Sequence, residues 1–170
     1  MRIEGTAVVI RLDDVDTDVL YPGRYIGILD DDEMAKHLFE GLDPTLRDQL
    51  VGPTILVGGA NFGTGSSREN VPAAMRASDI RCVIATSFAR IFQRNCINLG
   101  LLAIPCPAAV VAARPGSQIG IEVESGAIDV DGRAFQAAPL PPFMVELVQS
   151  GGLVPWMRGR MTTSEEERRA

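Results

Sequence analysis

One glycine-rich turn constrains this chain more than any other stretch of its sequence. It spans residues 58–69 and contains four glycines, which allow positive φ and let a ligand approach the main chain closely. The apolar run Thr54–Val57 before it predicts a short buried strand, and the pattern after it predicts a helix over Glu69–Arg76. The turn is therefore predicted to connect a strand to a helix.

The end of this turn has the residue types of an anion site. Ser66 and Glu69 are spaced as a capping box, with Ser66 at the N-cap and Glu69 at N3. Ser67 and Arg68 would then lie in the first helical turn, where free N–H groups and the helix dipole attract anions. Arg68 adds a forked cation that suits a carboxylate. We expect a small-anion site that contains a hydroxyl; the alternative is an ordinary glycine-rich turn with a plain N-cap.

Three other site motifs do not fit the turn. A Walker A loop needs a lysine, and none follows Gly65. The dinucleotide fingerprint needs a third glycine at the position of Arg68. Neither Ser66 nor Ser67 has the flanking glycines of a nucleophile elbow. These mismatches exclude the common nucleotide-binding and hydrolase signatures at this position.

Three segments of the chain resemble the signature motifs of the swivel domain of aconitase-type hydro-lyases. Residues 61–69 are similar to its active-site loop, residues 16–25 to its opening motif and residues 87–101 to its third signature. The similarity covers roughly Arg2 to Pro155. At this length the chain resembles a free-standing small subunit of the 3-isopropylmalate or homoaconitate dehydratase type. The resemblance implies an α/β, three-layer swivel-domain fold with a mixed, mostly parallel central sheet.

The resemblance also implies roles for individual residues. Ser66 stands where the family has its base serine, Arg68 where it has a substrate-carboxylate arginine, and Ser67 is the second hydroxyl of the motif. The loop that faces the variable end of the substrate is formed by Tyr25, Ile26, Gly27 and Ile28. Residues expected to support the site are Thr17, Asp18, Gly63, Gly65 and Glu69.

The loop at residues 25–28 predicts the class of substrate. Its isoleucines, Ile26 and Ile28, would make burial of a third carboxylate costly, whereas a small alkyl group would gain from the same contact. We expect 3-isopropylmalate first, as in leucine biosynthesis, and a methyl- or dimethylmalate second. A homoaconitate-type substrate is the remaining alternative within the family.

Dehydration of a hydroxy acid needs a base near the acidic carbon and a Lewis acid at the departing hydroxide. In the family an open [4Fe-4S] cluster supplies the Lewis acid and is held by the other domain or subunit. The cysteines of this chain, Cys82, Cys96 and Cys106, have no C-x-x-C spacing and are interpreted as neutral thiols in a reducing compartment. We therefore expect no metal ligands here and no activity without a cluster-bearing large subunit.

One position departs from the family pattern. The family has histidine and then alanine after the Ser-Ser-Arg-Glu run, and this chain has Asn70 and Val71. Asparagine forms hydrogen bonds but carries no proton at neutral pH. Two other classes stay open: a non-catalytic anion-binding or regulatory subunit, and a hydrolase that uses Ser66 or Ser67 with His37, the single histidine.

Composition sets the remaining expectations. The 170 residues predict one domain over residues 1–160 and a disordered polar tail over 161–170. Net charge −6 argues against nucleic acid or an anionic membrane as partner. The chain has neither a signal-like N-terminus nor a run long enough to span a bilayer, so we expect a cytoplasmic protein, with a homo-oligomer as an option for the isolated subunit.

The remaining pattern predicts βαβ units followed by an antiparallel hairpin. Residues 13–18 hold four carboxylates, which we interpret as a solvated acidic turn, because the calcium-loop pattern fails. The elements expected elsewhere are strands at 5–12, 81–86, 101–104, 118–123 and 127–130 and helices at 32–38, 44–50, 88–95 and 144–149.

Overall fold

A seven-stranded mixed sheet forms the centre of the molecule, in the order β4-β3-β2-β1-β5-β6-β7. The structure is a computed structural model that describes residues 1–167, with side chains to residue 161. The strands are β1 (Arg2–Ile10), β2 (Thr54–Gly58), β3 (Ile80–Ala85), β4 (Leu102–Pro105), β5 (Gln118–Glu122), β6 (Ala127–Val130) and β7 (Arg133–Gln136).

The sheet has a parallel half and an antiparallel half. Strands β1 to β4 run parallel to one another, and β5 pairs antiparallel with β1 and continues into the antiparallel strands β6 and β7. The predicted βαβ units and the hairpin are therefore confirmed. Because β1 to β4 are parallel, their carboxyl ends all lie at one edge of the sheet.

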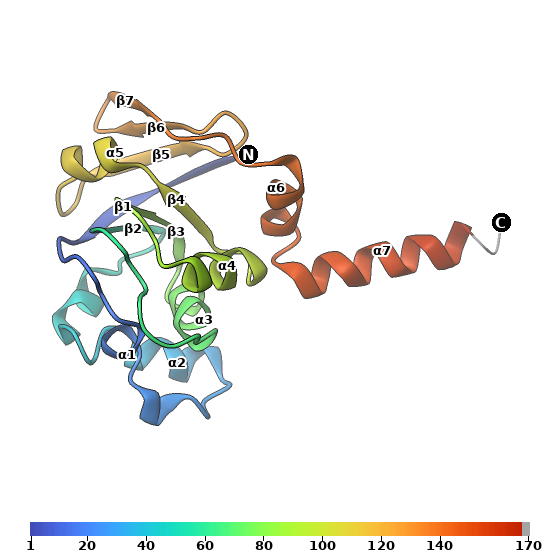
Figure 1. The fold of residues 1–170 in the computed structure, drawn as a ribbon, viewed down its shortest axis with the longest axis horizontal. Coiled ribbons are helices and arrows are strands. Elements are labelled where there is room, and N and C mark those ends of the chain that lie inside the picture. The colour runs from blue at the N-terminus through green and yellow to red at the C-terminus, as the bar shows by residue number, and fades with distance from the viewer. Residues whose placement is uncertain (168–170) are drawn as a thin grey trace.

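Helices cover the sheet on both faces (Figure 1). Buried side chains of α1 to α4 share one apolar cluster with the sheet, and those of α5 and α6 share a second cluster. The helices are α1 (Thr17–Leu20), α2 (Asp31–His37), α3 (Asn70–Ala77), α4 (Arg90–Asn98), α5 (Pro107–Ala112), α6 (Pro142–Gln149), α7 (Leu153–Glu167) and the 3₁₀ helices η1 (Gly23–Tyr25) and η2 (Pro44–Gln49). This arrangement is the predicted three-layer α/β fold.

The central strands are buried on both faces because successive residues alternate between the two clusters. Ile55 and Val57 of β2 point into the cluster with α5, whereas Leu56 points into the cluster with α1 to α4. Such strands have few positions that face solvent, so their sequences are short, nearly continuous apolar runs. That property made β2 and β3 predictable from the sequence alone.

Five elements were not predicted: α1, η1, α5, β7 and α7. Strand β7 follows β6 through Asp131 and Gly132, both with positive φ (51° and 81°), which is the Asp-Gly signal of a tight hairpin. Helix α7 projects away from the rest of the chain (Figure 1). It runs to Glu167, whereas we predicted no regular structure beyond residue 160. Residues 168–170 and all side chains after residue 161 lie outside the described part, so the predicted tail stays a prediction.

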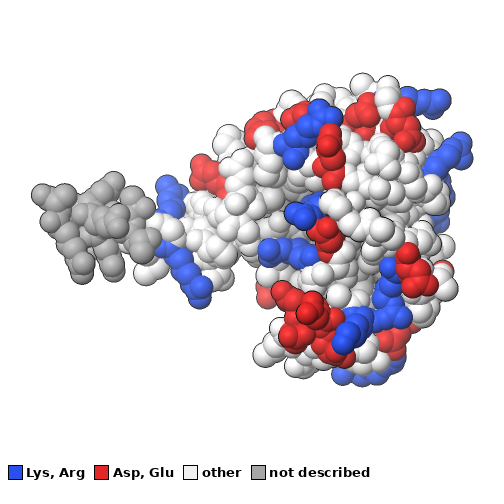
Figure 2. Space-filling model, turned by 180° about the vertical axis from the view of Figure 1, so that it is seen from behind, with Lys and Arg blue, Asp and Glu red and all other residues white. Residues whose placement is uncertain are grey.

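Basic and acidic side chains are interspersed over the face of the molecule shown in Figure 2. That face carries no broad surface of a single sign. Among the described residues, no helix combines the length and the apolar composition needed to cross a bilayer.

Candidate functional site

The glycine-rich turn lies where three parallel strands end. It leaves the carboxyl end of β2, the acidic segment 13–18 leaves the carboxyl end of β1, and Ser87 follows β3. The Ser87 hydroxyl accepts a hydrogen bond from the Asn61 backbone N–H at 2.8 Å, which joins two of these segments. The carboxyl edge of a parallel sheet is the usual place for a ligand in α/β folds.

The acidic segment is exposed at Asp13, Asp14 and Asp18, and its carboxylates also bind the glycine-rich turn. Asp13 accepts a hydrogen bond from the backbone N–H of Ala60 at 2.7 Å, and Asp14 accepts one from the side-chain amide of Asn61 at 2.7 Å. The predicted solvated turn therefore also has a structural role that the sequence interpretation did not include. The carboxylates replace backbone partners that an irregular turn lacks.

Backbone hydrogen bonds also join the acidic segment to the part of the turn that contains the predicted site residues. The N–H of Gly63 donates to the carbonyl of Val15 at 2.9 Å, and the N–H of Thr17 donates to the carbonyl of Thr64 at 2.9 Å. The buried Thr17 also donates its hydroxyl to the carbonyl of Ser66 at 3.1 Å. Thr17 therefore holds the backbone that carries Ser66.

Gly63 and Gly65 are required by the path of the turn. Both have positive φ, 79° and 90°, which favours glycine. A Cβ at Gly63 would overlap the ring of Phe92, and a Cβ at Gly65 would overlap the carboxylate of Asp16. The turn is therefore packed against α4 on one side and against the acidic segment on the other.

The predicted capping box does not form. Helix α3 begins at Asn70, and its N-cap, Glu69, makes no side-chain capping hydrogen bond. Ser66 lies three residues before that cap, in a backbone held by Gly65 and by Thr17, so it cannot adopt the N-cap position. Neither Ser67 nor Arg68 is in the first helical turn, and the helix dipole is not the source of an anion site at Ser66.

Arg68 is the most enclosed charged residue of the turn. Its side chain is 17% exposed and forms an ion pair with Asp18, which is 53% exposed. The guanidinium lies against Gly23, where an added Cβ would come within 3.0 Å of Nη1. Nη1 is the nitrogen that pairs with Asp18, although this ion pair does not form a regular hydrogen bond. The other N–H groups of the guanidinium can bind a ligand carboxylate.

The two hydroxyls of the motif are exposed, and they differ in their partners. Ser67 accepts a long hydrogen bond, 3.5 Å, from the side-chain amide of Asn95 on α4. Asn95 is buried, and we did not predict a role for it, although a polar residue on the inner face of a helix indicates one. The Ser66 hydroxyl forms no hydrogen bond within the described part of the chain.

The loop at residues 25–28 lies beside Arg68 and α3. Asn70 donates its side-chain amide to the carbonyl of Ile26 at 3.1 Å. Ile28 packs on the core, and Tyr25 is partly buried, which leaves Ile26 (44% exposed) and Gly27 at the surface. The fold therefore brings this loop to the same place as Ser66, Ser67 and Arg68.

The cysteines do not fit the ligand set of an iron–sulfur cluster. Cys82, Cys96 and Cys106 are free and buried, and burial raises the pKa of the Cys82 and Cys96 thiols far above the usual range. Cluster ligands are thiolates, which such burial disfavours. No group of three or more potential metal-ligating side chains occurs among the described residues.

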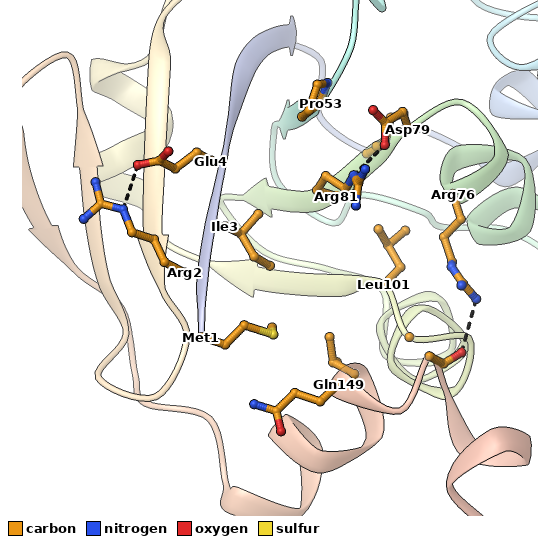
Figure 3. A pocket seen from close by; sticks show the side chains of 14 residues that line it. Met1, Arg2, Ile3, Glu4, Pro53, Arg76, Asp79, Arg81, Leu101 and Gln149 are labelled. Atoms are coloured by element: carbon orange, nitrogen blue, oxygen red, sulfur yellow. Dashed lines mark hydrogen bonds and ion pairs between the residues drawn. The ribbon is translucent and has the colours of Figure 1, made fainter.

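A separate hollow of about 700 Å³ lies at the opposite edge of the sheet, at the amino ends of the parallel strands (Figure 3). Its arginines are already paired: Arg2 with Glu4, and Arg81 with Asp79. Arg76 donates to backbone carbonyls of Leu99 and Gly151. The hollow contains none of the predicted site residues.

A mixed α/β domain with a serine- and arginine-containing turn at the carboxyl edge of its sheet defines an aconitase-type domain. Residues 46–109, which include the turn, match the family described as the aconitase C-terminal domain. The solved structure of 3-isopropylmalate dehydratase from Methanocaldococcus jannaschii is similar over 98% of this chain and 99% of that chain, with a TM-score of 0.90 and 33% identity.

Two curated relatives are both small subunits of dehydratases. The 3-isopropylmalate dehydratase small subunit 1 of Methanopyrus kandleri is 45% identical over 154 residues, 89% of this chain and 90% of the relative. The 2,3-dimethylmalate dehydratase small subunit of Eubacterium barkeri is 44% identical over 144 residues, 84% of this chain and 88% of the relative. The chain belongs to this family of dehydratase small subunits within the aconitase class. The family predicted from the three motifs is therefore confirmed.

Proposed function

We propose that this chain is the small subunit of a two-subunit hydro-lyase that reversibly dehydrates a malate with a small alkyl substituent, 3-isopropylmalate first. The observation that carries the proposal is the position of Arg68. Its enclosed guanidinium is held by the ion pair with Asp18, next to two exposed hydroxyls and an apolar loop. That combination suits a ligand with a carboxylate at one end and an apolar group at the other.

Arg68 would bind a carboxylate of the substrate. A planar guanidinium can keep its contact with Asp18 through one nitrogen and still present other N–H groups to a ligand. Asp18 and Gly23 fix the plane of the guanidinium before the substrate arrives. Such preorganisation lowers the entropic cost of binding.

Ser66 would act as the base that removes the proton next to a carboxylate. A neutral serine is a weak base, and helix α3 does not assist it, because Ser66 lies outside that helix. We therefore place the activation of its hydroxyl in the assembled enzyme, where the partner subunit and substrate complete the site. Ser67 would donate a hydrogen bond to the substrate while Asn95 holds it.

The residues of the loop favour a substrate with an alkyl substituent rather than one with a third carboxylate. Ile26 is exposed and uncharged, and Arg24, the cation next to this loop, is paired with Glu40 and stacked over the ring of Tyr25 at 4.7 Å. A third carboxylate would find no uncommitted arginine there, whereas a buried alkyl carbon would gain about 0.8 kcal/mol. The Eubacterium barkeri relative makes 2,3-dimethylmalate the second candidate.

The Lewis acid would come from the partner. We propose that a large subunit binds the [4Fe-4S] cluster of this enzyme class, since the buried thiols of this chain do not fit such ligands. In the complex the cluster would assist the departure of hydroxide. This chain would contribute Arg68, Ser66, Ser67 and the apolar loop, and it would have no dehydratase activity alone.

The hydrolase alternative has less support. His37, the single histidine, has Nδ1 at 2.9 Å from Glu40 and Nε2 at 3.4 Å from Glu33, so neither nitrogen contacts Ser66 or Ser67. A non-catalytic subunit remains the other alternative. It would bind the same carboxylates without turnover.

The test is co-expression with a cluster-bearing large subunit, anaerobic purification, and measurement of kcat/KM. The substrates are 3-isopropylmalate, methylmalate, 2,3-dimethylmalate and homoaconitate. We expect turnover only in the complex and a preference for the alkyl-substituted malates. Turnover by the isolated chain, or a preference for the tricarboxylic acid, would overturn the proposal. Binding without turnover in a complex with an intact cluster would favour the non-catalytic alternative.

A further inference from the structure

Glu40 is the centre of a compact polar cluster next to the loop at residues 25–28. It accepts hydrogen bonds from the Tyr25 hydroxyl at 2.9 Å, from Nη2 of Arg24 and from Nδ1 of His37 at 2.9 Å. Its side chain is only 25% exposed although it lies near the surface. We refer to Arg24, Tyr25, His37 and Glu40 as the Glu40 clasp.

The clasp also uses the ring of Tyr25. The imidazole of His37 stacks on that ring with centroids 3.7 Å apart and an angle of 13° between the planes. Hydrogen bonds from His37, Tyr25 and Arg24 lower the pKa of Glu40 to about 2, so Glu40 is a carboxylate at neutral pH. A carboxylate only accepts hydrogen bonds, and therefore Nδ1 of His37 carries the hydrogen in this contact.

The groups around His37 come from η1, from α2 and from the segment that follows α2. Glu33 of α2 lies 3.4 Å from Nε2 and is itself paired with Lys36. Tyr25 lies at the end of η1, and Glu40 follows α2. The clasp thus links η1 to α2, which is packed in the core through Met34.

The exposed part of the loop is held on both sides. The clasp holds Tyr25, whose carbonyl also accepts a hydrogen bond from the hydroxyl of buried Tyr21 at 3.2 Å. On the other side, Asn70 binds the carbonyl of Ile26. Gly27 has no neighbour within 4 Å of an added Cβ, so local packing does not fix the loop there. Its conformation depends on these anchors together with the hydrogen bond from the Ile28 N–H to the Tyr25 carbonyl at 3.0 Å and the packing of Ile28 on the core.

We propose that Glu40 is a positioning residue: through its clasp on Tyr25 it holds the loop so that Ile26 faces the substrate, and it thereby sets the preference among alkyl-substituted malates. This inference rests on the proposed function and deepens it. Glu40 does not need to touch the substrate. Its effect reaches the substrate through Tyr25 and the adjoining residue Ile26.

Two conservative variants separate this role from a general effect on folding. Tyr25→Phe removes the hydroxyl that binds Glu40 and retains a ring that can stack on His37. Glu40→Gln keeps the shape and removes the negative charge. The matched control is Arg81→Gln, which breaks an exposed ion pair at the opposite edge of the sheet.

The first measurement is amide hydrogen exchange of residues 24–28 in the full chain, alone and in complex with the large subunit. We expect both clasp variants to exchange faster there by about tenfold, and the control to match the wild type. Unchanged exchange in both clasp variants would overturn the clasp. This result needs no substrate and can be read whether or not the proposed activity is found.

The second measurement is the ratio of kcat/KM for 3-isopropylmalate and 2,3-dimethylmalate in the complex. We expect the clasp variants to change this ratio by about threefold to tenfold, mainly through KM, because a loose loop discriminates poorly. Faster exchange with an unchanged ratio would overturn the role in selectivity. A wild-type complex that turns over neither substrate would contradict the proposed function instead, and the exchange data would still decide whether the clasp holds the loop.

Discussion

The side-chain amide of Asn70 donates a hydrogen bond to the backbone carbonyl of Ile26, 3.1 Å away. This contact joins the first residue of α3 to the loop proposed to face the variable end of the substrate. Asn70 is the position at which the sequence departs from the histidine of the family motif. A neutral imidazole could donate a similar bond, so the departure preserves a donor and removes a group that can carry a proton.

Asn70→Ala should therefore act on substrate binding more than on the chemical step. Loss of one hydrogen bond to a partly exposed loop predicts a fall in kcat/KM of up to about tenfold, expressed in KM. Asn70→His should retain most of the activity, because its ring can donate to the same carbonyl. Steady-state kinetics of the assembled enzyme measures both. A histidine variant as impaired as the alanine variant would show that the amide itself is required.

Arg68→Lys should raise KM by about tenfold or more and change kcat less. An ammonium group can pair with either Asp18 or a substrate carboxylate, but it cannot present the planar fork that serves both. The control is Arg81→Lys, whose ion pair with Asp79 lies at the opposite edge of the sheet. An unchanged KM in Arg68→Lys would remove the assignment of Arg68 to the carboxylate.

Ser66→Ala should lower kcat by about 10²-fold or more, the scale of a general-base step. The melting temperature should change little, since the Ser66 hydroxyl is exposed and has no hydrogen-bond partner in the described part of the chain. Thermal unfolding and kinetics of the same preparation provide the comparison. A variant with full kcat would leave Ser66 without a chemical role.

The strands of the parallel half could be predicted because a buried strand has a continuous apolar sequence. Ile55 to Val57 is apolar at every position, as a strand covered on both faces requires. The helix predicted at residues 44–50 is the 3₁₀ helix η2, whose N-cap, Asp43, accepts a hydrogen bond from the backbone N–H of Thr45 two residues on. These features depend on neighbours in sequence.

The geometry of the turn could not be predicted in the same way, because distant residues determine it. The spacing of Ser66 and Glu69 favoured a capping box, but Thr17 binds the carbonyl of Ser66 and keeps that backbone out of the helix. The pairing of Asp18 with Arg68 joins residues 50 positions apart and has no local signal. The contact with Thr17 therefore prevents the capping box that the local sequence favours.

Gly63→Ala should destabilise the protein by about 2–4 kcal/mol, the sum expected for an overpacked contact and a left-handed backbone at a residue with a Cβ. The added methyl would meet the ring of Phe92 while φ stays at 79°. Gly27→Ala is the matched control, since no atom lies within 4 Å of its added Cβ and its φ is not positive. Urea unfolding of the two variants measures the difference. Equal stabilities would show that the turn can move away from Phe92.

The lowered pKa of Glu40 predicts how the free energy of unfolding depends on pH. Its pKa is lowered from 4.5 to about 2, first by the hydrogen bond from His37 and then by those from Tyr25 and Arg24. The unfolded chain, with an ordinary carboxyl pKa, binds a proton more readily than the folded chain. The stabilisation by this carboxylate is therefore complete above about pH 5 and is lost as the pH falls from about 4.5 toward 2.

Glu40→Gln removes this titration, so the free energies of unfolding of wild type and variant should differ most near pH 5 and converge toward pH 2. Urea unfolding at pH 5, 4, 3 and 2 measures the two curves. Tyr25→Phe should give an intermediate result, because Glu40 keeps the hydrogen bond from His37 and the contact with Arg24. A difference between wild type and Glu40→Gln that stays constant over this range would contradict the prediction, since it would mean that Glu40 titrates alike in the folded and unfolded chains.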